Sequence, residues 1–348
     1  MNLKLNNFDL IRLLAASQVA LTHIAAHLGY TNFFFQIIAI FPGVPIFFFI
    51  SGFLIYGSYE KSQKNRKVYF FINRGLRIYP ALYFCLIFST IIIWVSGYFE
   101  TRELNILDLL KYFVAQVSFF QFYNIDFFKD WGVGAVNGVL WTISVELQFY
   151  IITPIIYYFL NHLKKMNIFT LLFIFLIFNT LNSNFNDKDN VFYKLINVSF
   201  IPWLYMFLLG AIFYKFKNLQ IFTKNLSFGL LLTIFLISYF VTKDFGWGNK
   251  INPASFFILG LIIFKLAFAN PSLSNSILNN NDISYGIYIF HMPIVNYLIY
   301  KNIGNPENFL LAIIFTLTLS VISWFFIEKF FLKFKKYTLR KYQNNNKF

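Results

Sequence analysis

Ten long apolar runs, separated by short polar segments, dominate the chain. Each run is close to the roughly 17 to 25 residues that an α-helix needs to cross a bilayer. The runs cover residues 8–28, 39–58, 78–97, 138–160, 167–182, 198–214, 226–242, 253–269, 284–300 and 308–328. The pattern predicts an all-α polytopic membrane protein with about ten transmembrane helices.

Basic residues are concentrated in the polar segments on one side of the predicted membrane. When successive polar segments are assigned in turn to the two sides of the membrane, that side receives 20 of the 29 lysines and arginines. Six of these lie in segment 59–77. Cytoplasmic loops of membrane proteins carry such an excess. Both termini are therefore predicted to be cytoplasmic, with a transmembrane domain over residues 1–334 and a basic, disordered tail over residues 335–348.

The composition supports a membrane protein and excludes several other classes. Charged residues make up 12% of the chain, about half of their share in an ordinary soluble domain. The net charge of +15 follows the loops, so it indicates topology rather than nucleic-acid binding. The single cysteine, Cys85, excludes an internal disulfide and a cysteine metal cluster. We expect neither a nucleic-acid partner nor a metal.

The first apolar run carries four ionisable side chains, which is costly inside a bilayer and indicates a function. On a helix they fall on one stripe: Asp9, Arg12, His23 and His27. Arg12 and His23 are separated by about 16 Å along the helix axis. Ala16 and Ala20 share the stripe and let a neighbouring helix or a substrate approach closely. Gln18 faces the opposite side and has no assigned role.

Three other runs carry polar side chains that a lipid-facing helix does not tolerate. The second contains Ser51 within GVPIFFFISGFL, and the fourth contains Glu146 within WTISVELQFY. The ninth contains Tyr288 and His291 within SYGIYIFH. Together with the first run, these helices predict a polar path through the membrane.

Counting residues from the ends of the runs predicts which of these groups meet. His23 lies about five residues from the outer end of its run and Glu146 about eight from the same face, so we expect them to meet. A carboxylate beside an imidazole fixes its tautomer and builds a general base. In the alternative, Glu146 neutralises Arg12. Arg12 and His291 are placed in the inner half of the membrane.

Two arginines mark the cytoplasmic mouth of the third run. Arg74 and Arg77, within FINRGLRIYPALY, are three residues apart and lie on the same side of a helix. Paired guanidinium groups can grip phosphate oxygens. The alternative is ordinary positive-inside charge without a ligand.

The longest segment outside the membrane covers residues 98–137. It contains a pattern that predicts an amphipathic helix around residues 105–122, followed by the stretch DWGVGAVNG. Outer segments of this length are often functional. The alternative is a plain surface connector.

Together these motifs resemble the acyltransferase-3 family of integral membrane acyltransferases, which is best known for O-acetylating bacterial surface glycans. The resemblance covers essentially the whole chain and rests on five motifs in order. They are FDLIR with ten residues between Arg12 and His23, GVPIFFFISGFL, Arg74 with Arg77, WTISVELQFY and SYGIYIFH. The resemblance implies a multi-pass protein of the bacterial inner membrane. Many members carry an additional extracytoplasmic hydrolase-like domain after the membrane unit. This chain ends soon after its tenth apolar run, so we expect it to be a stand-alone form.

The resemblance also implies an acyl-CoA donor from the cytosol, with acetyl-CoA as the expected one. The implied acceptor is a hydroxyl of a cell-surface polysaccharide or of its lipid-linked precursor. Within the family pattern, His23 takes part in acyl transfer, and Arg74 with Arg77 contacts the donor.

The motifs and the resemblance define two expected groups of site residues. The catalytic group comprises His23, Glu146, Arg12 and Asp9. The donor-binding group comprises Arg74, Arg77, Tyr288, His291 and Ser51. His23 acts either as the base that deprotonates the acceptor hydroxyl or as a nucleophile that forms an acyl-imidazole. Arg12, or a donor from the ninth run, stabilises the developing negative charge.

Two functions of other classes compete with this interpretation. A transporter or flippase for a glycan intermediate would use the polar stripe as its pathway. A non-catalytic membrane sensor or assembly partner has no need for ionisable groups at these depths. Acceptor-dependent release of free CoA distinguishes the enzyme from the transporter.

Overall fold

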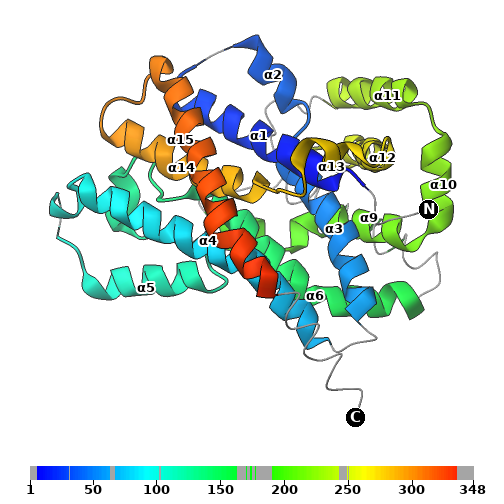
Figure 1. Cartoon of the computed structure of the whole chain (residues 1–348), viewed down its shortest axis with the longest axis horizontal. Coiled ribbons are helices and arrows are strands. Elements are labelled where there is room, and N and C mark those ends of the chain that lie inside the picture. The colour runs from blue at the N-terminus through cyan, green and yellow to red at the C-terminus, as the bar shows by residue number, and fades with distance from the viewer. Residues whose placement is uncertain are drawn as a thin grey trace. The chain divides into compact units, whose positions relative to one another are not determined.

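The computed structural model describes most of the chain and is all-helical there. The described ranges are residues 6–30, 32–62, 67–101, 103–162, 190–242 and 251–334, with positions 170, 173, 174, 177 and 249. Within these ranges no strand occurs, which confirms the predicted all-α class (Figure 1). The predicted tail over residues 335–348 lies outside the described residues, as does the predicted span over residues 167–182 apart from the isolated positions.

The fold consists of α-helices joined by short turns, several of them 3₁₀-helical. The α-helices are α1 Phe8–His27, α2 Phe33–Ala39, α3 Gly43–Ser62, α4 Val68–Val95, α5 Ile106–Val117, α6 Trp141–His162, α8 Val191–Asn197, α9 Leu204–Lys215, α10 Lys217–Asn225, α11 Phe228–Val241, α12 Pro253–Phe268, α13 Leu273–Leu278, α14 Ser284–Tyr300 and α15 Phe309–Ile322. The 3₁₀ turns are η1 Tyr98–Glu100, η2 Asp126–Asp130, η3 Gly138–Leu140, η4 Ile201–Trp203 and η5 Pro306–Asn308. A π-helix, η6 Ser323–Glu328, continues α15.

Several described helices can cross a membrane, but the predicted count of ten is not confirmed. Five described helices are long and apolar enough, or up to seven if each of two bent pairs is one span. Among the described residues, helices overlap nine of the predicted ranges, and the four described positions of the range 167–182 are helical too. α12 has 16 residues and α14 has 17, which is short for a full span. α4 begins at Val68, inside the segment predicted as a cytoplasmic loop. The count of ten and the cytoplasmic termini stay predictions.

The chain divides into two compact units, which are described separately. Unit 1 consists of residues 1–19, 33–65 and 142–280, and unit 2 of residues 20–32, 66–141 and 281–348. The division falls within α1, so Arg12 belongs to unit 1 and His23 to unit 2.

The two faces of α1 have different roles, as the sequence predicts. Ala16 and Ala20 are buried, whereas Leu14 on the opposite side is 62% exposed. Gln18 has a role that the sequence did not indicate, because its Oε1 accepts a hydrogen bond of 2.8 Å from the backbone N–H of Gly43. Gly43 begins α3, and the first N–H groups of a helix have no partner within that helix. Gln18 therefore caps a helix end where lipid would supply no acceptor.

In unit 1, α3 and α9 approach each other closely at two glycines. Gly52, in the motif ISGF, lies against the backbone carbonyl of Phe207, and Gly210 lies in the same way against the carbonyl of Phe49. A Cβ atom on either glycine would collide with the opposing backbone. Small residues allow helix backbones to approach in this way, so the second sequence motif has a packing role.

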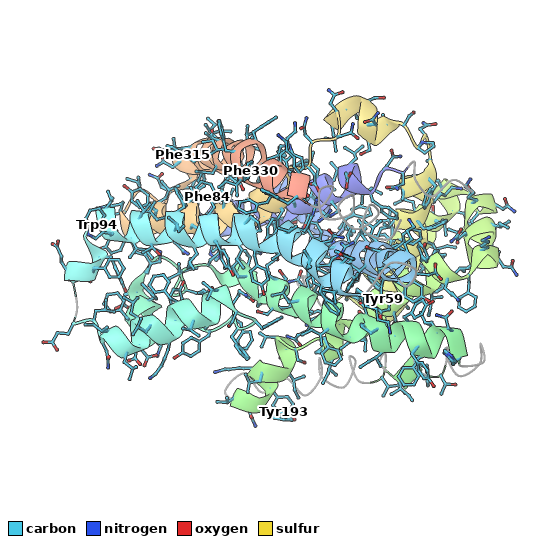
Figure 2. The ribbon with its side chains drawn as sticks, turned by 60° about the horizontal axis from the view of Figure 1, so that its bottom comes forward. Tyr59, Phe84, Trp94, Tyr193, Phe315 and Phe330 are labelled. Carbon is cyan, nitrogen blue, oxygen red and sulfur yellow. The ribbon has the colours of Figure 1, made fainter. Side chains whose placement is uncertain are left out.

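In unit 2, α4 packs against α14 and η6, and α14 lies beside α15 (Figure 1). The rings of Phe84 on α4 and Phe290 on α14 have centroids 5.4 Å apart. Figure 2 shows Trp94 near the end of α4, and Phe315 and Phe330 along the last helix. Their exposed fractions are 70%, 50% and 51%. Large apolar side chains that remain exposed on helices of spanning length are typical of a lipid-facing surface.

The long outer segment is a packed part of unit 2 rather than a plain connector. The predicted helix around residues 105–122 is confirmed as α5, which ends at Val117. Trp131 of the stretch DWGVGAVNG is fully buried, with its ring centroid 5.3 Å from that of Tyr98 and 4.8 Å from that of Tyr300.

A buried asparagine fastens this segment to α14. Asn296 accepts a hydrogen bond of 3.0 Å from the Val133 N–H through Oδ1. Its Nδ2 donates to the carbonyls of Ala135 at 2.7 Å and Val136 at 3.0 Å. These three hydrogen bonds satisfy buried backbone groups and hold the segment against α14.

Replacement of Gly52 by alanine is expected to destabilise unit 1. The added Cβ meets a backbone carbonyl that cannot rotate away, so the cost should be about 3 kcal/mol, at the upper end for overpacking. The measurement is the unfolding midpoint of the purified protein in detergent. Gly229→Ala is the matched control, because its nearest atom, Ser227 Oγ at 3.8 Å, leaves room for a methyl group. Equal midpoints for the two variants would contradict the packing role.

Candidate active site

Two histidines from different helices meet in unit 2. His23 lies near the C-terminal end of α1, and His291 lies in the middle of α14. His23 Nδ1 is 3.1 Å from His291 Nε2, and the ring centroids are 5.3 Å apart. His291 is fully buried, whereas His23 is partly exposed. The pair therefore has one side chain that is enclosed by protein and one that is partly exposed.

The hydrogen bonds of this pair determine which nitrogen of each ring carries the proton. His291 Nδ1 lies 3.1 Å from the backbone carbonyl of Ile287. A carbonyl only accepts, so His291 Nδ1 carries the hydrogen and Nε2 of the neutral ring is an acceptor. His23 Nδ1 must then donate to it, which leaves the lone pair on His23 Nε2. The geometry thus presents an unprotonated imidazole nitrogen for proton transfer or nucleophilic attack.

The position of His291 differs from the predicted one. The sequence placed His291 in the inner half of the membrane with Arg12, apart from His23. The structure instead puts the two imidazoles in contact. Counting residues from the ends of each run assumes that every helix begins at the same level, and α14 is too short for that assumption to hold.

A proline explains why α14 needs support close to His291. Pro293 has no N–H, so the carbonyl of Ile289, four residues earlier, receives no hydrogen bond from within the helix. Asn137 Nδ2 donates to this carbonyl at 2.8 Å, and Cys85 Sγ donates at 3.3 Å. Neighbouring side chains commonly satisfy the backbone groups that proline frees in membrane helices. Cys85 is thus a buried donor that stabilises the helix.

Arg77 is held by a carboxylate that the sequence analysis did not single out. Arg77 donates to Asp282, which is buried just before the first turn of α14. Asp282 Oδ1 also accepts from the Ser284 N–H at 3.2 Å and from the Ser284 hydroxyl. A carboxylate at a helix N-terminus is stabilised by the helix dipole. This ion pair ties α4 to the beginning of the helix that carries His291.

The other predicted donor-binding groups of unit 2 occupy distinct positions. Arg74 lies on α4, with its guanidinium carbon 5.7 Å from the centroid of the Phe70 ring. Tyr288 is buried, and its hydroxyl donates to the Val139 carbonyl at 3.3 Å. Contact of these residues with a donor stays a prediction.

The remaining predicted site residues belong to unit 1. Arg12 Nη1 lies 4.0 Å from Asp9 Oδ1, so these two charges are neighbours on the first turns of α1. Glu146 accepts a hydrogen bond of 2.5 Å from the Tyr150 hydroxyl. Ser51 is half-buried on α3. The predicted meeting of Glu146 with His23, and the alternative pairing with Arg12, both stay predictions.

Within the described ranges, no group of three or more His, Cys, Asp or Glu side chains is arranged to hold a metal ion. The ionisable groups of unit 2 form pairs instead, such as the two histidines and Arg77 with Asp282.

Comparison with known proteins decides the family. The family model described as an acyltransferase domain, of the acyltransferase-3 type, matches residues 5–328. The chain belongs to the acyltransferase-3 family. This confirms the resemblance that the five sequence motifs indicated.

Two relatives of this acyltransferase-3 chain are similar over nearly their whole length, and a third over about half of its length. Nodulation protein 10 of Rhizobium leguminosarum bv. viciae is 30% identical, with 93% of this chain and 92% of that protein covered. The O-acetyl transferase of Shigella phage Sf6 is 27% identical, with 94% and 96% covered. The O-acetyltransferase OatA of Staphylococcus aureus is 24% identical over 83% of this chain and 52% of its own length. No solved structure matches the chain.

Three polar residues of this acyltransferase-3 chain became evident only in the structure. Asp282 stands two residues before the first residue of the motif SYGIYIFH, and this proximity was the one available signal in the sequence. Asn137 stands at the end of the outer segment. Glu328 is 2% exposed in the π-helix η6, where its Oε1 accepts a hydrogen bond of 3.0 Å from the Ser323 hydroxyl. Its place at the end of an apolar run made it resemble an ordinary interfacial charge.

Replacement of Asn137 by alanine is expected to destabilise unit 2. The change removes the shorter of the two hydrogen bonds to the Ile289 carbonyl, and such a loss at a buried site costs about 1–3 kcal/mol. Unfolding midpoints in detergent provide the measurement. Asn308→Ala is the control, because Asn308 Nδ2 makes a similar bond to the Ile303 carbonyl in an exposed turn. The midpoint of N308A should change less, and an unchanged midpoint of N137A would show that the support of α14 is unimportant.

Proposed function

We propose that this acyltransferase-3 protein is a membrane O-acyltransferase that uses acyl-CoA, with acetyl-CoA as the expected donor. The acceptor is a hydroxyl of a cell-surface polysaccharide or of its lipid-linked precursor, and the protein resides in the bacterial inner membrane. The O-acetyltransferase names of relatives that align over most of the chain support the acetyl group and the oxygen acceptor. The apolar helices support residence in a membrane.

The contact of His23 Nδ1 with His291 Nε2 is the observation that carries this proposal. It leaves His23 Nε2 as the reactive nitrogen in both routes. As a base, Nε2 takes the proton of the acceptor hydroxyl while the hydroxyl oxygen attacks the thioester carbonyl. The C–S bond then breaks, and the CoA sulfur takes the proton from the imidazolium. As a nucleophile, Nε2 attacks the thioester carbonyl, the C–S bond breaks and CoA leaves as the thiolate. The acceptor hydroxyl then attacks the acyl-imidazole, the C–N bond breaks, and the hydroxyl proton passes to the CoA thiolate.

The second ring of the pair has a positioning role in this mechanism. His291 accepts from His23 Nδ1–H and is itself oriented by the Ile287 carbonyl. When His23 Nε2 takes a proton, the positive charge of the imidazolium strengthens its hydrogen bond to His291. The sequence suggested a donor-binding role for His291, and the contact with His23 favours the positioning role.

The arginines of α4 support a donor site in the same unit. Arg77 has five N–H donors in a planar fork, so it can bind Asp282 and a phosphate oxygen together. Arg74, three residues earlier, lies on the same side of α4. The negative phosphates of CoA are the complementary ligand for such a pair.

Replacement of His23 or His291 by alanine tests the mechanism. His23→Ala should abolish acceptor-dependent release of free CoA from acyl-CoA. His291→Ala should lower kcat by about 10²-fold, at the lower end for general base catalysis, with little change in the KM for acyl-CoA. His291→Gln should recover part of the rate, because the Gln carbonyl oxygen can accept from His23 Nδ1–H.

Other outcomes of this experiment would assign different roles to the two histidines or to the protein. Full activity of H23A would contradict the proposed function, and absence of CoA release from the wild type would favour a transporter. A raised KM with unchanged kcat in H291A would return His291 to donor binding. Circular dichroism of each variant verifies that the helices are retained.

Charge reversal at Arg77 tests the donor site. Arg77→Glu should raise the KM for acyl-CoA by about 10-fold or more, since a charge-assisted hydrogen bond contributes about 1.5–3 kcal/mol. Asp282→Asn is the control, because it removes the ion pair but keeps Arg77 available for phosphate. Equal KM increases in both variants would show that Arg77 acts only through the ion pair. An unchanged KM in Arg77→Glu would favour the positive-inside interpretation.

A further inference from the structure

A basic pocket lies in unit 1, on helices that carry none of the proposed catalytic groups. It has a volume of about 520 Å³ and lies where α3, α9 and α10 end or begin. Its lining includes three lysines, Lys215, Lys217 and Lys224, and one carboxylate, Glu60. Glu60 shares a hydrogen bond with Tyr214, another lining residue. With three ammonium groups against one carboxylate, the pocket has the charge of an anion-binding site.

The lysines are held by a rigid helix rather than by a loose loop. Gln220 of α10 is buried, and its Nε2 donates to the carbonyls of Phe213 at 2.8 Å and Tyr214 at 3.1 Å. These carbonyls end α9, where they have no donor within the helix. At the other end of α10, Lys265 Nζ donates to the Lys224 carbonyl at 2.8 Å. The position of α10 on α9 and α12 is therefore fixed.

α10 also has the geometry of a helix that lies along a membrane surface. It meets α11 at 95° (Figure 1). α11 is apolar but has only 14 residues, so it would enter the bilayer without crossing it fully, and α10 would then lie near the plane of the headgroups. Two apolar side chains of α10 remain exposed beside the lysines, Ile221 by 60% and Phe222 by 58%. This combination of basic and exposed apolar residues is typical of interfacial helices.

We propose that this pocket binds the phosphate group of an anionic membrane lipid. Lys217 and Lys224 would contact the phosphate, while Ile221 and Phe222 contact the upper part of the acyl chains. The excess of basic residues predicts that this turn lies on the cytoplasmic side, where anionic lipids attract basic segments. A free phosphate compound has the same charge chemistry, but it gives no reason for the exposed Ile221 and Phe222. The proposal does not depend on the proposed acyl transfer.

The experiment measures lipid binding to the full-length purified protein. Native mass spectrometry compares the retention of phosphatidylglycerol and phosphatidylcholine from mixed detergent micelles. In the variant Lys217→Gln with Lys224→Gln, phosphatidylglycerol binding should weaken by about 25-fold, since each lysine near the membrane surface contributes about 5-fold. Retention of phosphatidylcholine should not change. Substitution of the same two lysines by arginine should preserve the preference for phosphatidylglycerol.

A control variant and a second binding measurement complete the experiment. Lys129→Gln with Lys194→Gln removes the same charge from two exposed lysines outside the pocket and should leave lipid binding unchanged. Binding of inorganic pyrophosphate is measured in parallel. Equal phosphatidylglycerol binding by wild type and K217Q/K224Q would overturn the proposal. So would loss of pyrophosphate binding with unchanged lipid binding, which would identify a site for a free phosphate compound.

Discussion

A polar group in the apolar part of this protein must obtain its hydrogen bonds from the protein itself, and the structure depends on this constraint. Lipid offers neither donors nor acceptors. The Ile289 carbonyl that Pro293 leaves open is therefore paired with Asn137 and Cys85. For the same reason the imidazole of His291 is fixed between the Ile287 carbonyl and His23.

One helix connects the groups that matter in unit 2. Just before α14, Asp282 pairs with Arg77; in its middle, His291 contacts His23; toward its end, Asn296 binds the outer segment. A change in the position of α14 would therefore move the proposed donor site and the proposed reactive imidazole together. This arrangement explains why a helix of only 17 residues contains so few positions that face lipid.

In unit 1, small side chains allow the helices to pack closely. Gly52 and Gly210 bring the backbones of α3 and α9 together, and Gln18 of α1 caps α3. The motif GVPIFFFISGFL therefore has a structural explanation that is independent of Ser51. The basic pocket at the end of α9 lies on this same framework, because Gln220 fastens α10 to α9.

The all-helical class, the positions of most described helices, the family and the small buried face of α1 at Ala16 and Ala20 could be predicted from the sequence. The helices and the buried face follow from local composition and from the 3.6-residue period, which depend only on neighbouring residues, whereas the family follows from five motifs in order. The contacts of His291 with His23, of Arg77 with Asp282 and of Asn137 with the Ile289 carbonyl became evident only from the packing of the helices. Each of these contacts joins residues 50 or more positions apart, as with His23 and His291 at a separation of 268. Helix level, tilt and rotation bring such residues together, and packing against neighbouring helices sets all three.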